Sequence, residues 1–349
     1  MQSHQKKIIF LLSLVVVALG ANILPQSGRV ITVKDELRTR NEALSLISLE
    51  SRAAVFPSAN STDSDMRIGP ENNNERVISK DKTITEGAFV APLTFSEPPF
   101  KQMGEVFPPE ITATIAVVSD LESGTSYLDK GVSRHWPIAS ITKLMTAVTA
   151  SKVLSPEARV LITAEDFPKE RDSTSAYLKA GEEYLVSDLM QMMLIASDNV
   201  AAEVLARAYG REKFLLKMNE QAELWGMGKT YYYDPSGLSP VNQSSAGDLE
   251  KLAFQLTSQG EDILRISRKP EGRVTEQVSG REYRVAAINT FAGRSDFLGG
   301  KTGFIDEAGG NLFSIFSVRS RPILIVVFNS AARFEDTARL LSWFKENYQ

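Results

Sequence analysis

The sequence predicts an α+β fold: an antiparallel sheet flanked by helices, together with an all-helical region. Three observations within residues 106–349 support this prediction. A β-rich run, 111–118, stands near the start of this part, and two more, 311–318 and 323–328, stand near its end. The segments between them show the helical spacing of apolar residues. Strands at both ends with helices between them are typical of this class, and we find no internal repeat.

Turns, caps and periodicity predict the remaining elements. Ser123-Gly124 predicts a turn into a second strand, and Ser187-Asp188 predicts a helix N-cap. After Ser140, apolar residues recur at i, i+3, i+4 and i+7, which predicts a helix with one apolar face. The last two strands are expected to join around Ser320-Arg321-Pro322. The predicted helices begin near Pro137, near 187, after Asn199, at 248 and at 334, and the second strand covers 125–128.

The composition excludes several classes of function. The chain has 349 residues and a net charge of −4, so nothing suggests nucleic acid as a partner. It has no cysteine, which excludes disulfides and thiolate catalysis. The only histidines, His4 and His135, are too few for a typical zinc site. His135 is also only five residues before Ser140, whereas a triad histidine usually comes from a distant segment. We expect no metal and no other cofactor.

The N-terminal part differs from the rest. Lys6 and Lys7 precede an apolar run that ends near residue 24, so 1–24 is expected to be either an export signal or a retained membrane anchor. Residues 25–105 are polar and proline-rich and predict a mostly disordered spacer. Because the lysines belong on the cytoplasmic side of a membrane, the rest of the chain is expected outside the cytoplasm, secreted or anchored.

Three short strings carry the chemistry: Ser140-Ile-Thr-Lys143, Ser197-Asp-Asn199 and Lys301-Thr-Gly303. No string is informative alone, because Ser-x-x-Lys occurs four times in the chain. Their joint order and wide spacing allow the intervening structure to fold all three into one cleft. Together they supply a nucleophile, a base, a proton shuttle and an anion-binding strand. This is the equipment of a serine acyl-transferase that needs neither histidine nor metal.

The first two strings divide the acid–base work. Ser140 and Lys143 are one helical turn apart, so both side chains lie on one face near a helix N-terminus. A lysine serves as a base only when it is partly neutral, which requires burial or a nearby positive charge such as Lys301. Ser197 would relay a proton to the leaving amine, while Asn199 would hold the substrate backbone and orient Lys143. Taken singly, these residues also fit ordinary helix caps and solvated side chains.

The third string is suited to an anion. Lys301 supplies a cation and Thr302 a hydroxyl, and both suit a substrate carboxylate. Gly303 leaves room for an extended substrate beside the strand. The backbone amides of Ser140 and Phe304 would form an oxyanion hole. Alone, this string also fits a glycine-rich turn with a surface lysine.

With their flanking residues, these motifs resemble the D-alanyl-D-alanine carboxypeptidases among the low-molecular-mass penicillin-binding proteins. The resemblance covers 106–349 and is carried by the segments 137–147, 234–240 and 300–309. It implies a β-lactamase/transpeptidase-like fold and a DD-peptidase domain in the cell envelope. It also implies that a peptidoglycan stem peptide acylates Ser140, with β-lactams as inhibitors.

The same resemblance assigns roles to further residues. Lys143 would be the base, and Lys301 and Thr302 would bind the terminal carboxylate. Arg333 matches an arginine that assists with this carboxylate in some members, although it also fits a solvated helix-start residue. Phe304 stands where some members carry His or Tyr. The C-terminal β-domain and anchor of several relatives are not found, so membrane attachment is expected only at the N-terminus, and the oligomeric state is not predicted.

Several functions compete. The leading one is a D-Ala-D-Ala carboxypeptidase that trims stem peptides. A DD-endopeptidase that cleaves cross-links breaks the same kind of bond, and the sequence does not separate the two. A class A β-lactamase would need a Glu-x-x-Leu-Asn string, and 212–216 fails at its last position. A non-catalytic wall-binding module is the remaining alternative, although every named side chain is present.

Overall fold

The structure is a computed structural model that describes residues 100–167 and 175–349. The predicted signal or anchor, 1–24, and almost all of the predicted spacer, 25–105, lie outside the described residues. Among the residues that are described, no helix is long and apolar enough to cross a membrane.

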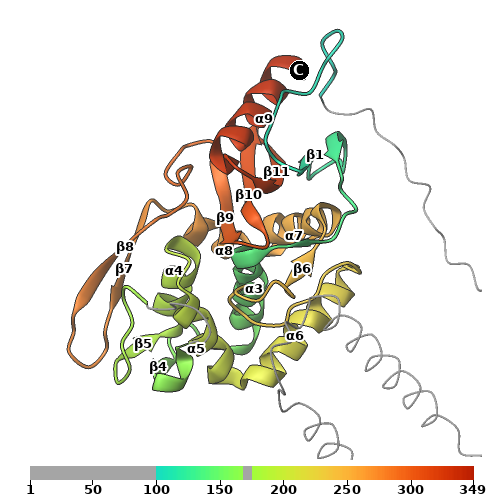
Figure 1. Ribbon diagram of the computed structural model, residues 1–349. Coiled ribbons are helices and arrows are strands. Elements are labelled where there is room, and N and C mark those ends of the chain that lie inside the picture. Colours follow the sequence, from blue (N-terminus) through green and yellow to red (C-terminus); the bar gives the residue numbers. More distant parts are fainter. Residues whose placement is uncertain (1–99, 168–174) are drawn as a thin grey trace, which may run out of the picture. The chain divides into compact units, whose positions relative to one another are not determined.

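A five-stranded antiparallel sheet forms the centre of the described part (Figure 1). Its strand order is β2-β1-β11-β10-β9, which places β9 at one edge. Val117, Val326, Phe313 and Lys301 form one row across the sheet, and directly opposed residues point to the same face. The strands are β1 Ile115–Asp120, β2 Ser126–Lys130, β9 Phe297–Ile305, β10 Gly309–Val318 and β11 Arg321–Ser330.

The sheet separates two hydrophobic cores. Val117 and Val326 pack against the helical region, whereas the alternating residues Val118 and Val327 pack against helix α9. Helix α9, Arg333–Asn347, lies along the second face (Figure 1). Lys301 shares a row with Val117, so its side chain projects toward the helical region.

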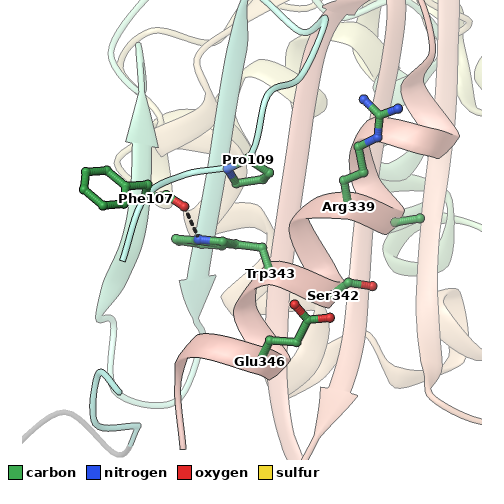
Figure 2. A pocket seen from close by; sticks show the side chains of 7 residues that line it. Phe107, Pro109, Arg339, Ser342, Trp343 and Glu346 are labelled. Atoms are coloured by element: carbon green, nitrogen blue, oxygen red, sulfur yellow. Dashed lines mark hydrogen bonds between the residues drawn. The ribbon is translucent and has the colours of Figure 1, made fainter. Parts of the chain in front are cut away.

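The segment that leads into β1 is fastened along α9. The Trp343 indole donates a hydrogen bond to the Phe107 carbonyl at 2.8 Å, and a shallow groove of about 410 Å³ lies beside this contact (Figure 2). Arg339, Ser342 and Glu346 extend from α9 along the groove (Figure 2). This groove lies on the α9 side of the sheet, away from Lys301.

The helical region lies on the other face of the sheet (Figure 1). It contains α3 Lys143–Val153, α4 Val186–Ile195, α5 Asn199–Tyr209, α6 Arg211–Leu224, α7 Ala246–Gln259 and α8 Glu261–Ser267. The 3₁₀ turns are η1 Ala139–Thr142 and η2 Ala164–Asp166. The two-stranded ribbons pair β3 Trp136–Pro137 with β6 Gln243–Ser244, β4 Arg159–Leu161 with β5 Glu183–Leu185, and β7 Glu271–Thr275 with β8 Glu282–Ala286.

The predicted α+β class is confirmed, and two local predictions are corrected. The helix at Ser140 begins as a 3₁₀ turn and becomes α-helical only at Lys143. The Ser187-Asp188 cap prediction is wrong, because α4 already begins at Val186 after the extended residue Leu185. Strand β5 runs directly into this helix, so no loop residue is left to cap it.

Candidate active site

Lys143 is the centre of the site. Its side chain is fully buried, and its Nζ atom lies 2.9 Å from Ser140 Oγ and 2.6 Å from Asn199 Oδ1. The third acceptor is the Ser236 carbonyl oxygen, also at 2.6 Å. Three N–H donors of a charged lysine therefore meet three neutral acceptors. The structure thus brings together the predicted pair Ser140 and Lys143 with the predicted Asn199.

Two glycines clamp the turn that presents Ser140. Gly237, with φ of +82°, lies so close that an added Cβ would be 2.0 Å from the Ala139 carbonyl oxygen. On the other side, a Cβ on Gly303 would be 2.7 Å from the Ile138 carbonyl oxygen and 3.3 Å from the Ser140 amide nitrogen. Ala139 itself has φ of +49°, a left-handed conformation that is uncommon for a non-glycine residue. The nucleophile turn is therefore held between one loop and strand β9.

The loop 234–242 delivers the Ser236 carbonyl to Lys143. The Asp234 carboxylate accepts hydrogen bonds from the amides of Ser236 at 2.8 Å and Gly237 at 2.5 Å. The Asn242 side chain ties this loop to Thr142, since its Nδ2 donates to Thr142 Oγ1 at 3.0 Å. In the sequence this segment stands out only through the resemblance, and the role of the Ser236 carbonyl is not predicted. The signal that was available is Asp-Pro-Ser-Gly, a sequence typical of a side-chain-stabilised turn.

Lys301, which is buried, pairs with Ser197, which is half-buried. Lys301 is 1% exposed, and its Nζ donates to Ser197 Oγ at 2.7 Å and to the Thr302 carbonyl at 3.0 Å. Ser197 has φ of +61°, so its backbone is in the left-handed region where a non-glycine residue is strained. Asp198 follows as the N-cap of α5 and accepts from the Ala201 amide at 3.0 Å. The cap fixes the strained serine opposite strand β9.

Burial depresses the pKa of both lysines. Desolvation lowers the pKa of Lys143 to about 8, although Asp234, Asp198 and Glu203 oppose the shift. Desolvation also lowers the pKa of Lys301 well below its usual value, and repulsion from Lys143 and Arg333 adds to the effect. The sequence predicted that the charge of Lys301 would lower the pKa of Lys143, but burial is the cause there, and repulsion between the two amines contributes only at Lys301.

The remaining predicted residues lie on or beside β9. Arg333, at the start of α9, is half-buried, and its Nη1 donates to the Gly303 carbonyl at 3.0 Å. Burial lowers the pKa of this guanidinium. Thr302 alternates to the opposite face from Lys301 and is nearly fully buried. The Phe304 side chain is 60% exposed at the sheet edge.

The chemistry available here is nucleophilic and acid–base. Two amines of depressed pKa are each hydrogen-bonded to a serine hydroxyl, Lys143 to Ser140 and Lys301 to Ser197. Within residues 100–167 and 175–349, no group of acidic and histidine side chains is arranged to hold a metal ion. This arrangement is suited to acyl transfer through a serine ester.

Comparisons with known proteins agree with this geometry. Residues 102–332 match the family model of D-alanyl-D-alanine carboxypeptidases, peptidase family S11. A D-alanyl-D-alanine endopeptidase of Haemophilus influenzae is 37% identical over 207 residues, which cover 55% of this chain and 66% of that protein. One from Pseudomonas aeruginosa is 31% identical over 265 residues, which cover 73% of this chain and 84% of that protein. Penicillin-binding protein D2 of Listeria monocytogenes, solved with ampicillin bound, has a TM-score of 0.60 and 28% identity, covering 67% of this chain and 98% of that one.

The fold and the family match together define a serine peptidase of the penicillin-binding protein class. The chain belongs to the D-alanyl-D-alanine carboxypeptidase family, S11. The predicted resemblance and the predicted transpeptidase-like fold are confirmed.

Proposed function

We propose that this protein is a DD-peptidase of the cell wall that acts through an acyl-enzyme on Ser140. One observation carries the proposal: the three hydrogen bonds of Lys143 Nζ. A neutral lysine keeps two N–H donors and gains one lone pair. Asn199 Oδ1 and the Ser236 carbonyl oxygen cannot donate, so they retain the two N–H groups. The lone pair then faces Ser140 Oγ, and Lys143 becomes the base for that hydroxyl alone.

The acylation step follows from this arrangement. Ser140 Oγ attacks the carbonyl carbon of a D-alanyl peptide bond as its proton moves to Lys143 Nζ. The oxyanion is stabilised by the amide of Ser140 and, as proposed from the sequence, that of Phe304. When the C–N bond breaks, the leaving amine takes a proton relayed through Ser197, whose hydroxyl is hydrogen-bonded to Lys301. Water then hydrolyses the ester and restores Ser140.

The third string and Arg333 are proposed to bind substrate. Strand β9 forms one edge of the sheet, so an extended peptide has space to lie along it. Lys301 and Arg333 approach the same stretch of β9, and a substrate carboxylate would favour the charged form of Lys301. We propose that these two side chains hold that carboxylate. The Thr302 side chain, which the sequence predicted as a third contact, lies on the opposite face of β9 and is nearly fully buried, so it is not placed to join them.

We further propose that cross-linked peptides are the preferred substrate. The relatives that are 30–37% identical are named endopeptidases, whereas several that are 24–27% identical are named carboxypeptidases. The carboxypeptidase activity first expected from the sequence is the second candidate, supported by the description of the matching family. Both activities would use the same acyl-enzyme, so they differ only in the leaving group.

The test is a direct competition between substrates. Purified protein is given equal concentrations of a stem pentapeptide and a cross-linked muropeptide dimer, and the products are separated by mass. We expect dimer to be converted to monomers faster than D-alanine is released. Faster release of D-alanine would reverse the preference. Absence of both products, with no penicillin adduct, would reject the peptidase itself.

The location of the protein is proposed from the same chemistry. Its substrate would be the cell wall, so we propose that the domain works in the envelope outside the cytoplasm, either secreted or anchored through the N-terminal segment. β-Lactams are proposed as covalent inhibitors at Ser140. Cell fractionation with an antibody to the domain tests the location, and a cytoplasmic signal alone would contradict it.

A further inference from the structure

A second cavity, of about 340 Å³, is lined by residues that the proposed function does not use. It lies between the β1–β2 turn and helix α7. The turn side contributes Ser119 and Leu121, and α7 contributes Glu250 and Phe254, which are one helical turn apart. Trp225, at the end of α6, adds an aromatic wall. The cavity therefore combines apolar surface with a small polar group of side chains.

Two of its charged residues are already balanced. Asp120 is fully buried and accepts from Arg321 Nε at 2.7 Å and from Arg321 Nη2 at 3.1 Å. Lys251 pairs with Asp248 at 3.1 Å and also donates to the Gly226 carbonyl. Neither Asp120 nor Lys251 therefore leaves a free charge for a ligand.

Glu250 is different. Its carboxylate is half-buried, and among the described residues no lysine or arginine nitrogen lies within ion-pair distance of it. Burial raises the pKa of Glu250, and the nearby Ser119 offsets this only in part. The cation that acts on it, Lys251, is already paired with Asp248, so Glu250 has no ion-pair partner of its own among the described residues.

The hydroxyl of Ser119, next to Glu250, is a second sign of a missing ligand. Its side chain is 3% exposed, and its hydroxyl oxygen is buried without a hydrogen-bond partner in the described structure. It lies close enough to the Glu250 carboxylate to lower the pKa of that group, yet it makes no hydrogen bond of good geometry with any described residue. Buried polar atoms are nearly always paired, so an unpaired hydroxyl that lines a cavity indicates a group that would complete it. The ligand must satisfy both the acid and the hydroxyl.

We propose that this cavity binds a primary ammonium group on an aliphatic stem. A diamino acid in a stem peptide of the cell wall carries such a group when its side-chain amine is free. An ammonium group has three donors and no acceptor, which suits a carboxylate together with hydroxyl lone pairs. The apolar stem would lie against Leu121, Phe254 and Trp225.

The choice of a stem peptide as the source rests on the proposed function. The wall polymer carries many stem peptides, so a chain bound at Ser140 would present neighbouring amines at high effective concentration. The cavity would hold one neighbour while another is cleaved. It is a binding site only, because no nucleophile of the catalytic group lines it.

Nuclear magnetic resonance of the full chain tests the binding directly. The protein has three tryptophans, so its ¹⁵N-labelled form gives three indole signals, and a Trp225→Phe variant identifies the one from the cavity. The probes are Nα-acetyl-lysine amide, which keeps the ammonium, and Nα,Nε-diacetyl-lysine amide, which lacks it. We expect the Trp225 signal to shift and saturate with the first probe only. Equal shifts with both probes, or no shift, would overturn the proposal.

A variant pair separates the carboxylate from general effects. Glu250→Gln keeps the shape and should weaken binding of the charged probe at least tenfold, whereas Glu261→Gln, an exposed site on α8, should leave it unchanged. Unchanged affinity in Glu250→Gln would refute the role of the carboxylate. On insoluble wall, Glu250→Gln should release product several-fold more slowly than the wild type.

Two further arms keep the interpretations apart. A stem tripeptide with a free diamino-acid amine should bind more tightly than the lysine amide. If it does not bind while a lysine-rich protein tail does, the wall peptide is the wrong source. Penicillin labelling of Ser140 is measured on the same samples. If the wild-type protein is labelled by penicillin but does not bind the amine, only this inference is rejected. If the wild-type protein is not labelled at all, the proposed function is rejected.

Discussion

The two faces of the central sheet bury charged groups with opposite results. Behind the sheet, Asp336 of α9 is fully buried and accepts from the Thr112 amide at 3.0 Å, Thr112 Oγ1 at 2.7 Å and Ser330 Oγ at 2.6 Å. Burial alone would raise its pKa, but the hydrogen bonds from Ser330 and Thr112 outweigh it, so the pKa is lowered. In front of the sheet, burial lowers the pKa of Lys143 and Lys301 and thereby disfavours their charged forms.

The difference lies in the partners. Asp336 has donors that stabilise its charge, whereas each lysine is bonded to neutral oxygens. The charge of Asp336 is stabilised by its hydrogen bonds, which connect α9 to the segment before β1. The charged forms of the two lysines are not stabilised to the same degree, so these lysines can lose a proton more easily. The stabilising charge therefore lies on the α9 face of the sheet, and the reactive lysines lie on the face toward the helical region.

The largest expected effect comes from removing the reacting groups at the front. Ser140→Ala or Lys143→Met should lower the rate of acylation by penicillin about 10⁴-fold or more, because each removes a member of one catalytic unit. Intact-protein mass spectrometry measures the adduct. Ser151→Ala is the matched control, since that hydroxyl only caps back to the Val148 carbonyl of the same helix. If Lys143→Met were acylated at the wild-type rate, another group would have to be the base.

The second-largest effect is expected when the turn that presents Ser140 is no longer held by Gly237. Gly237→Ala should destabilise the protein by about 3 kcal/mol, because a Cβ would lie 2.0 Å from the Ala139 carbonyl oxygen and φ is +82°. Urea unfolding measures the change, and acylation should fall with it. Gly228→Ala is the control, because an added Cβ there meets nothing within 4 Å. Equal stability of the two variants would mean that the turn is not clamped.

The back of the sheet should respond in stability alone. Asp336→Asn should cost about 2 kcal/mol, since it removes charge-assisted hydrogen bonds. The folded pKa of Asp336 is lowered, so its contribution is present above the unfolded pKa and is lost as pH falls through the folded value. The variant should therefore lose less stability on acidification than the wild type does.

Urea titrations at neutral and acidic pH measure this contrast, with Glu335→Gln as the exposed neighbouring control. Acylation per folded molecule should stay within about twofold of the wild type. A large loss of acylation in Asp336→Asn would remove the division between the two faces.

The smallest effect is expected at Arg333, which connects α9 with strand β9. Arg333 starts α9 but reaches the Gly303 carbonyl, so Arg333→Ala should raise the penicillin concentration for half-maximal acylation about tenfold, or ~1.4 kcal/mol, with little change in the maximal rate. Arg339→Ala, two turns further along α9 and exposed, should change neither quantity. A fall in the maximal rate alone would place Arg333 outside carboxylate binding.

Much of the fold could be predicted because its signals are local. A helix was predicted after Asn199, and α5 covers Asn199–Tyr209. The predicted strands near the C-terminus correspond to β10 and β11. The prediction of a cap at Ser187-Asp188 failed because β5 leads into α4 without a loop. The position of β5 depends on its pairing with β4, which a local pattern does not reveal.

The site was predicted at the level of side chains but not of backbone. The three strings pointed to Ser140, Lys143 and Lys301 because their joint order and spacing set them apart from chance matches. The Ser236 carbonyl has no such signature, since every residue carries one. The left-handed backbone of Ser197 was likewise hidden, because the sequence places no glycine there. Tertiary packing alone imposes both features.

The central claim is that neutral Lys143 activates Ser140, and the pH dependence of acylation tests it most directly. The second-order rate constant for penicillin acylation reports the free enzyme. With a Lys143 pKa of about 8, the neutral fraction rises about tenfold between pH 7 and pH 9. We predict a rising limb of this size, centred near pH 8, with the adduct on Ser140. A rate that is flat from pH 6 to pH 9, or an adduct on any other residue, would contradict the account.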